Sequence, residues 1–170
     1  MHQFTLLFVL ICNLLNLSAQ TTHISAKYEV YLFLLEDCKI TQAYTDELQK
    51  IYQAFAGDSI RFTGFFPNPV SEDSTMQAFI KKYELPFVCT REGAYELAQR
   101  FGVAVTPEVV VYDSTHDAVV YQGRIDNLFE RVGQRRRVVT SHDLMSALTC
   151  IQHNKPVKPS RTKAVGCFLQ

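Results

Sequence analysis

The sequence predicts one α/β domain, built on a mixed central β-sheet with helices on both faces. Three observations support this. The chain has 170 residues, of which 47% are hydrophobic and 20% charged. These values are typical of one globular domain with a substantial core. Short apolar runs also alternate with helical apolar stripes. A helix between successive strands implies a parallel core sheet, and a late hairpin adds an antiparallel edge.

The first half of the domain is predicted to alternate strand and helix. Residues 27–35 (KYEVYLFLL) end in an unbroken apolar run, which is typical of a strand buried on both faces. Apolar residues then recur at helical spacing from Tyr44 to Phe55. Residues 60–66 alternate as a second strand, and Pro67-Asn68-Pro69 breaks the chain.

The second half repeats this order and adds a hairpin. Residues 71–74 are of the types that begin helices, and an apolar stripe follows them to Tyr83. The remaining predicted elements are a short strand at 87–88, a helix at 95–101, strands at 109–112 and 118–121, and a helix at 144–151.

The first 20 residues predict a signal peptide, and an uncleaved membrane anchor is the alternative. They contain no Lys, Arg, Asp or Glu, and the apolar stretch is too short to span a bilayer comfortably. Ser18-Ala19-Gln20 suits cleavage, whereas Ile11 before Cys12 argues against a lipoprotein site. We therefore expect a signal peptide at 1–20, a domain at 21–153 and an irregular tail at 154–170. This organisation implies a periplasmic or secreted protein without stable membrane insertion.

The charge balance argues against nucleic-acid binding. Lys+Arg and Asp+Glu each total 17, so no broad positive field attracts phosphate. Arg131 and Arg135 to Arg137 form a local exception. We interpret them as a solvated loop, with Arg124 and Asp126 in ion pairs, and an anion site as the alternative.

Four of the five cysteines lie beyond the predicted signal peptide: Cys38, Cys89, Cys150 and Cys167. An oxidising compartment allows them to pair in three full connectivities, and the sequence does not choose among them. Cys89 and Cys150 lie in apolar surroundings that predict burial. Cys150 and His153 have C-x-x-H spacing, but no second ligand pair accompanies them, so we predict no metal site. No cofactor motif is present.

Cys38 is the candidate nucleophile. Asp37 is a natural N-cap, which would place Cys38 in the first turn of the helix after a buried strand. The free N–H groups and positive partial charge there favour a thiolate. Ligands of open α/β sheets also bind beyond the carboxyl ends of parallel strands. The alternative is an unreactive, half-buried thiol.

The segment from Tyr31 to Leu48, YLFLLEDCKITQAYTDEL, resembles the strand, active-site turn and first helix of thioredoxin-like proteins of the redoxin type. Residues 106–108 resemble the cis-proline segment that faces the active cysteine in that fold. Residues 121–127, 135–144 and the tail Val165-Gly166-Cys167 resemble late segments of a bacterial exported redoxin group.

The resemblance implies a thioredoxin-like fold, a cis bond before Pro107, and substrate contacts from Thr41, Thr106 and Pro107. On the residues alone, a trans Pro107 at the start of a strand is the simpler interpretation. The sequence departs from the C-x-x-C redox motif, because residues 38–41 read Cys-Lys-Ile-Thr. It also departs from peroxiredoxins, whose reactive cysteine would occupy the position of Thr41, so we expect weak or no peroxidase activity.

A mixed disulfide at Cys38 has no neighbouring thiol to release it, so a second thiol must come from elsewhere. We predict that Cys167 is this partner. Two alternatives stay open: a structural Cys150–Cys167 disulfide, or a tail held only by Phe168 and Leu169. The leading functional hypothesis is an exported thiol–disulfide oxidoreductase or redox carrier that acts on protein or small-molecule thiols and disulfides. The other is a thioredoxin-like binding module that has lost turnover.

Overall fold

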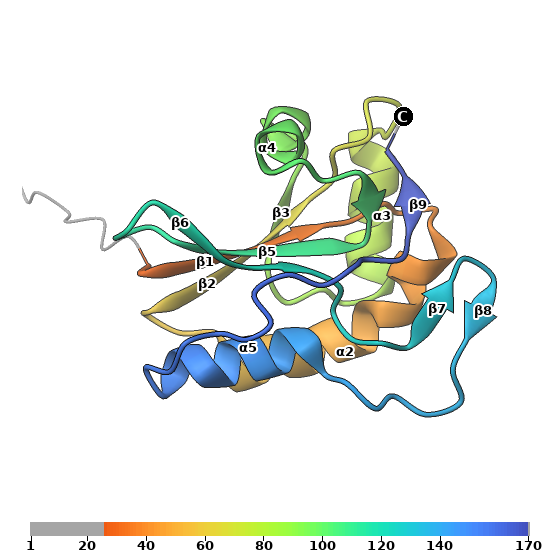
Figure 1. Cartoon of the computed structure of the whole chain (residues 1–170). Coiled ribbons are helices and arrows are strands. Elements are labelled where there is room, and N and C mark those ends of the chain that lie inside the picture. The colour runs from red at the N-terminus through yellow and green to blue at the C-terminus, as the bar shows by residue number, and fades with distance from the viewer. Residues whose placement is uncertain (1–25, 170) are drawn as a thin grey trace, which may run out of the picture.

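The computed structural model describes residues 26–169, so the predicted signal peptide lies outside the described residues. A five-stranded sheet forms the centre, in the order β3-β2-β1-β5-β6 (Figure 1). The strands are β1 (Tyr28–Phe33), β2 (Ile60–Phe65), β3 (Val88–Thr90), β4 (Val105–Thr106), β5 (Glu108–Asp113), β6 (Ala118–Gly123), β7 (Phe129–Arg131), β8 (Gln134–Arg135) and β9 (Cys167–Phe168). The helices are α2 (Lys39–Phe55), α3 (Asp73–Lys82), α4 (Ala94–Phe101) and α5 (Asp143–Gln152).

The sheet is mixed, as the sequence predicts, but the antiparallel part reaches its centre. β1 and β3 pair parallel with β2, whereas β5 pairs antiparallel with β1. The expectation that only a hairpin at the edge is antiparallel is therefore wrong. After α4 the chain enters β5 at the carboxyl end of β1, where Glu108 pairs with Phe33. A strand that starts at this end must run opposite to β1.

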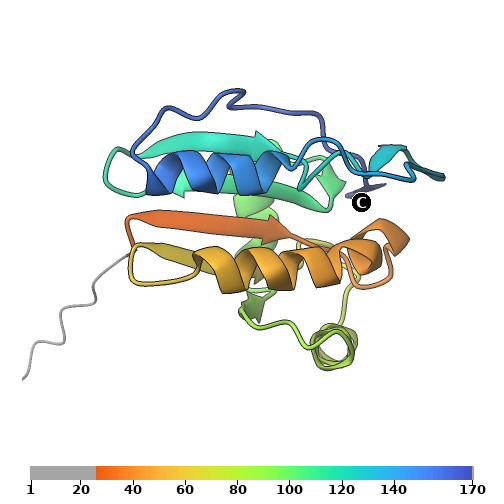
Figure 2. The ribbon, with the colours of Figure 1, turned by 90° about the horizontal axis from the view of Figure 1, so that it is seen from below.

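Helices cover both faces of the sheet. α2 and α5 lie side by side on one face, and α4 lies on the other (Figures 1 and 2). Alternation along β1 accounts for this arrangement. Val30 and Leu32 belong to the larger buried cluster, which includes side chains of α2 and α5, whereas Phe33 packs with Ala98 of α4. Among residues 26–169, no helix has the length and apolar character needed to cross a membrane.

After α5 the chain crosses back over the domain in a long, mostly irregular segment, which ends in the short strand β9 (Figure 1). β9 pairs antiparallel with β4, and these two strands form a small separate sheet. The sequence patterns did not predict β4, β9 or the β7–β8 hairpin. Strands of two or three residues are too short to leave a periodic pattern.

Candidate redox site

Cys38 lies just beyond the carboxyl end of β1, where the chain turns into α2. It is itself the N-cap residue of α2, with extended backbone angles. The prediction that Asp37 caps the helix is wrong: Asp37 lies in an exposed turn, and no side chain caps α2. Cys38 therefore directly precedes the first free N–H groups of α2. These groups favour a negative charge on Cys38 Sγ.

The turn before Cys38 is fixed by its own backbone and by α3. The Cys38 N–H donates to the Leu35 carbonyl oxygen over 3.2 Å. The Glu36 carboxylate accepts one hydrogen bond from the hydroxyl of Ser71 and one from that of Thr75, both 2.9 Å long. Glu36 thus connects the cysteine turn to the start of α3. The sequence did not indicate a role for Glu36, because a lone glutamate before a helix carries no distinctive pattern.

Thr41, which occupies the position of the second motif cysteine, is completely buried. Its hydroxyl accepts a hydrogen bond of 3.4 Å from the Leu35 backbone N–H. Thr41 therefore stabilises the turn between Leu35 and Cys38 from its buried side. Substrate contact by Thr41 stays a prediction.

The structure joins Cys38 and Cys167 in a disulfide, with their Cα atoms 6.1 Å apart. Cys167 is the first residue of β9 and pairs with Thr106 of β4. Cys38 retains only 2% of its accessible surface, and Cys167 is half-buried. The disulfide therefore attaches the tail directly over the cysteine turn.

Thr106 and Pro107 lie beside this disulfide. The Thr106–Pro107 peptide bond is cis, as the resemblance implied, and both residues are buried. Cys38 Sγ lies 3.3 Å from the Thr106 carbonyl oxygen. A reduced Cys38 thiol at this distance could donate to that oxygen, since hydrogen bonds of sulfur are longer than those of nitrogen or oxygen. The predicted residues Cys38, Thr106, Pro107 and Cys167 thus form one group.

A second set of contacts holds the tail before β9, along β6. The Gln122 N–H donates to the Ser160 carbonyl oxygen over 2.9 Å, and the Thr162 N–H donates to the Gln122 carbonyl oxygen over 3.0 Å. The Arg161 guanidinium donates to the buried Gln122 amide oxygen over 2.8 Å. A Cβ at Gly123 would overlap the backbone of Thr162, so this close approach requires a glycine.

The other two cysteines of the described region are free thiols away from the disulfide. Cys89 and Cys150 are half-buried, so they are more exposed than the predicted core thiols. Burial raises the pKa of Cys89 to about 12. A thiol with this pKa is almost entirely protonated at neutral pH and is a poor nucleophile.

The arginines that the sequence singled out lie on and after the β7–β8 hairpin. Arg131 donates to Gln134 over 2.7 Å, and Arg136 forms a 2.7 Å ion pair with Glu130. All four arginines are exposed, in keeping with the solvated loop of the sequence analysis. Arg124 pairs over 2.8 Å with Asp143.

Asp126 is buried, and within residues 26–169 it forms no ion pair, so the expected ion pair of Asp126 is wrong. Its Oδ1 accepts hydrogen bonds from the Tyr44 hydroxyl (2.6 Å) and the Leu128 N–H (2.7 Å). Glu47 and His142 lie nearby, and ligand atoms of these two residues and Asp126 fall within 4.8 Å of one another. Because Asp126 Oδ1 already has two donors, we interpret the group as a polar link between α2, the segment after β6 and α5.

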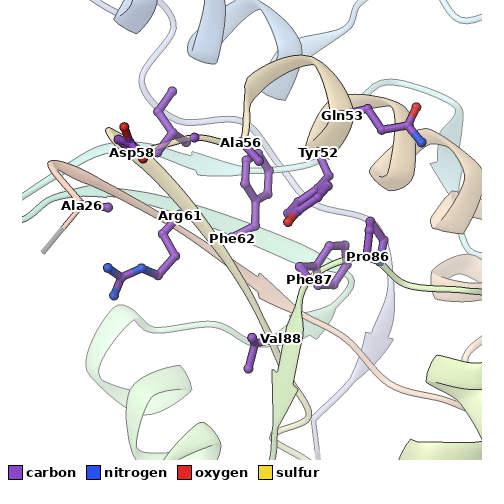
Figure 3. Close-up of a pocket in the computed structure, with 12 residues that line it drawn as sticks. Ala26, Tyr52, Gln53, Ala56, Asp58, Arg61, Phe62, Pro86, Phe87 and Val88 are labelled. Atoms are coloured by element: carbon purple, nitrogen blue, oxygen red, sulfur yellow. The ribbon is translucent and has the colours of Figure 1, made fainter. Parts of the chain in front are cut away.

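A pocket lies at the opposite end of β1 from Cys38 (Figure 3). Tyr52, Phe62 and Phe87 line it, together with Ala26, which precedes β1, and the exposed Val88 of β3. None of the described cysteines lines this pocket, so it is separate from the candidate site at Cys38.

Comparison with known proteins supports the fold. No family model matches the chain, and no curated protein matches it. A hypothetical protein from Sinorhizobium meliloti is similar in structure, with a TM-score of 0.73 and 22% sequence identity, over 86% of this chain and 80% of that one. An uncharacterised conserved protein from Geobacillus kaustophilus gives a TM-score of 0.70 and 19% identity, over 86% and 78% of the two chains.

A third similar structure is a secreted disulfide oxidoreductase from Mycobacterium tuberculosis, described as homologous to E. coli DsbE. Its TM-score is 0.51 at 19% identity, over 75% of this chain and 84% of that one. The chain thus has a thioredoxin-like α/β fold. In this chain, Cys38 at the start of α2 lies beside the cis Thr106–Pro107 bond, and Cys167 of the tail forms the disulfide with Cys38.

Proposed function

We propose that the protein is an exported thiol–disulfide oxidoreductase or redox carrier in which Cys38 is the nucleophile and Cys167 the resolving cysteine. The disulfide between these two residues supports the proposal most strongly. Cys38 has the position that favours a thiolate, and the partner missing from position 41 is supplied by β9.

The proposed reaction uses two thiol–disulfide exchanges. The Cys38 thiolate attacks one sulfur of a substrate disulfide, forms a mixed disulfide and releases the first substrate thiolate. The Cys167 thiolate then attacks Cys38 Sγ and releases the second substrate thiolate. The substrate disulfide is reduced to two thiols, and Cys38 and Cys167 are oxidised to their disulfide. An external dithiol reduces that disulfide and completes the cycle.

Export to the periplasm or the extracellular space is part of the proposal. The charge-free apolar segment at the start of the sequence and a disulfide-forming cysteine pair both support it. Its partners would be thiols and disulfides of proteins or small molecules, with no cofactor. N-terminal sequencing of the exported protein should find Thr21 first, and finding Met1 would contradict cleavage.

The test of the activity is reduction of a small disulfide, such as glutathione disulfide, by the reduced full chain. Cys38→Ser should abolish the reaction, whereas Cys167→Ser should accumulate a mixed disulfide at Cys38 that mass spectrometry detects. Cys89→Ser is the matched control and should behave like the unmodified protein. Loss of activity in Cys89→Ser, or normal activity in Cys38→Ser, would refute the proposed roles.

A binding module without turnover is the second candidate function. Thr41 favours it, because this buried hydroxyl replaces the second motif cysteine and is hydrogen-bonded to the Leu35 N–H. Under this alternative the Cys38–Cys167 disulfide only fastens the tail. Cys38 would then stay unreactive towards glutathione disulfide even after full reduction of the protein.

A further inference from the structure

Among residues 26–169, the backbone edge of β4 has a single strand partner, β9. β4 pairs with no strand of the five-stranded sheet. The pairs Thr106–Cys167 and Val105–Phe168 form the small sheet, and the Leu169 N–H extends it by donating to the Ala104 carbonyl oxygen over 3.1 Å. Removal of β9 would leave this edge unpaired. An unpaired strand edge is a site where an extended peptide can add as a strand.

β9 and the part of the tail before it are held by separate sets of contacts. Phe168 is 76% exposed, whereas Cys167 packs against the larger buried cluster and Leu169 against the smaller one. Residues 160–162, by contrast, are fixed to β6 by the contacts of Gln122. Reduction of the disulfide removes the covalent cross-link between β9 and the cysteine turn, and β9 is then held by its backbone pairing with β4 and by the packing of Leu169. Residues 160–162 can keep their contacts while β9 leaves β4.

Gly166, which directly precedes Cys167, lies where there is no room for a side chain. Gly166 is buried against Thr106, and a Cβ at this position would overlap the Thr106 carbonyl group. The atoms in the way belong to the backbone, so a rotamer change cannot relieve the clash. Phe168, which directly follows Cys167, is not restricted in this way, because its side chain is largely exposed to solvent.

We propose that the β4 edge is the substrate site for extended polypeptides in which a glycine directly precedes the reacting cysteine, and that β9 is its built-in occupant. This inference rests on the proposed function. The substrate peptide pairs with β4 while its cysteine is in the mixed disulfide with Cys38. β9 must then return to β4 for Cys167 to reach Cys38 Sγ, so resolution and release of the peptide occur in one exchange.

The first test measures the tail itself and requires no turnover. In the full chain, Gly166→Ala should lower the equilibrium constant for forming the Cys38–Cys167 disulfide in a glutathione buffer by about one to two orders of magnitude, the size of an overpacking penalty. Gly57→Ala is the matched control, because a Cβ at Gly57 has nothing within 4 Å. Equal equilibrium constants for Gly166→Ala and the unmodified chain would overturn the proposal.

The second test measures peptide preference. The full-length double variant Gly166→Ala/Cys167→Ser is designed to displace the tail, and it retains Cys38. The probes are the acetylated, amidated peptides AVGCFL and AVACFL, and the readout is the mixed disulfide with Cys38 in a glutathione buffer. The glycine peptide should be favoured by at least about tenfold, on the same steric ground.

The outcomes separate this proposal from the proposed function. A Cys38 that reacts with glutathione disulfide but treats the two peptides alike would overturn the substrate proposal alone. A Cys38 that reacts with neither glutathione disulfide nor peptide would overturn the oxidoreductase as well. In Cys167→Ser with an intact Gly166, the tail competes for β4, so the glycine peptide should form less mixed disulfide than in the double variant.

Discussion

Cys38 and Cys167 are separated by 129 residues in sequence, and their Cα atoms lie 6.1 Å apart. This is within the range that a disulfide spans. A cross-link over so long a loop restricts the unfolded chain strongly. We expect a reductant to lower the free energy of unfolding by about 2–5 kcal/mol, measured by urea denaturation. Cys167→Ser should be insensitive to reductant, and an equal loss in that variant would contradict this explanation.

Thiol reactivity should distinguish Cys38 from Cys89 in the reduced protein. Burial raises the pKa of Cys89 to about 12, so its thiolate is scarce below that pH. In the reduced protein, departure of β9 would uncover Cys38, and the start of α2 then favours its thiolate, so we expect its pKa below the ordinary value of about 8.5. Iodoacetamide at pH 7 should therefore modify Cys38 well before Cys89. A pH profile that gives Cys38 an apparent pKa at or above 8.5 would refute this expectation.

The hydroxyl of Tyr44 should stabilise the fold through Asp126. Tyr44→Phe keeps the ring that packs against Phe129 but removes the 2.6 Å hydrogen bond to the buried carboxylate. Loss of a partner of a buried charged group predicts destabilisation by about 1–3 kcal/mol in chemical denaturation. Tyr95→Phe is a suitable control, since the Tyr95 side chain is 40% exposed. A Tyr44→Phe protein as stable as this control would contradict the prediction.

Asp113 should make stability sensitive to acid. Burial alone would raise the pKa of its carboxyl, but hydrogen bonds from Thr115 and His116 outweigh burial and lower the pKa from 3.8 to about 2. Because the folded-state pKa is lowered, the contribution is present above about pH 4 and is lost as the pH falls towards 2.

Comparison of the unmodified protein with Asp113→Asn tests this dependence. The unmodified protein should be more stable at pH 7, and the difference should shrink between pH 4 and pH 2. The exposed Asp58 supplies the control Asp58→Asn. A difference between the unmodified protein and Asp113→Asn that does not change with pH would show that the carboxylate charge is not its source.

The sequence predicted the fold class and the helices well, because long apolar patterns report burial directly. Strand direction was harder to predict. The direction of β5 depends on where α4 delivers the chain, and that is a property of packing. The N-cap of α2 was misplaced by one residue, since backbone angles at Cys38 decide it. The dipeptide Thr106-Pro107 suggested a cis bond only through a family resemblance.

The cysteine pairing could not be derived from the sequence, which left Cys150 as another partner for Cys167. The contacts that direct the tail are made between residues distant in the sequence, such as Gln122 and Arg161. The steric demand at Gly166 is also tertiary, because it comes from the Thr106 backbone. Such contacts leave no periodic signal, so the site required a structure.

The position of β9 in the chain has a consequence for the order of folding. Cys167 follows every strand and helix against which the tail lies, so its disulfide with Cys38 can form only after the chain through residue 167 has been made. Until then Cys38 is an unpaired thiol in a growing chain. Early burial of Cys89 against Gly64 would keep the Cys89 thiol from forming a disulfide with Cys38 in place of Cys167. Formation of the Cys38–Cys167 disulfide would thus depend on the packing of Cys89 into the core before β9 pairs with β4.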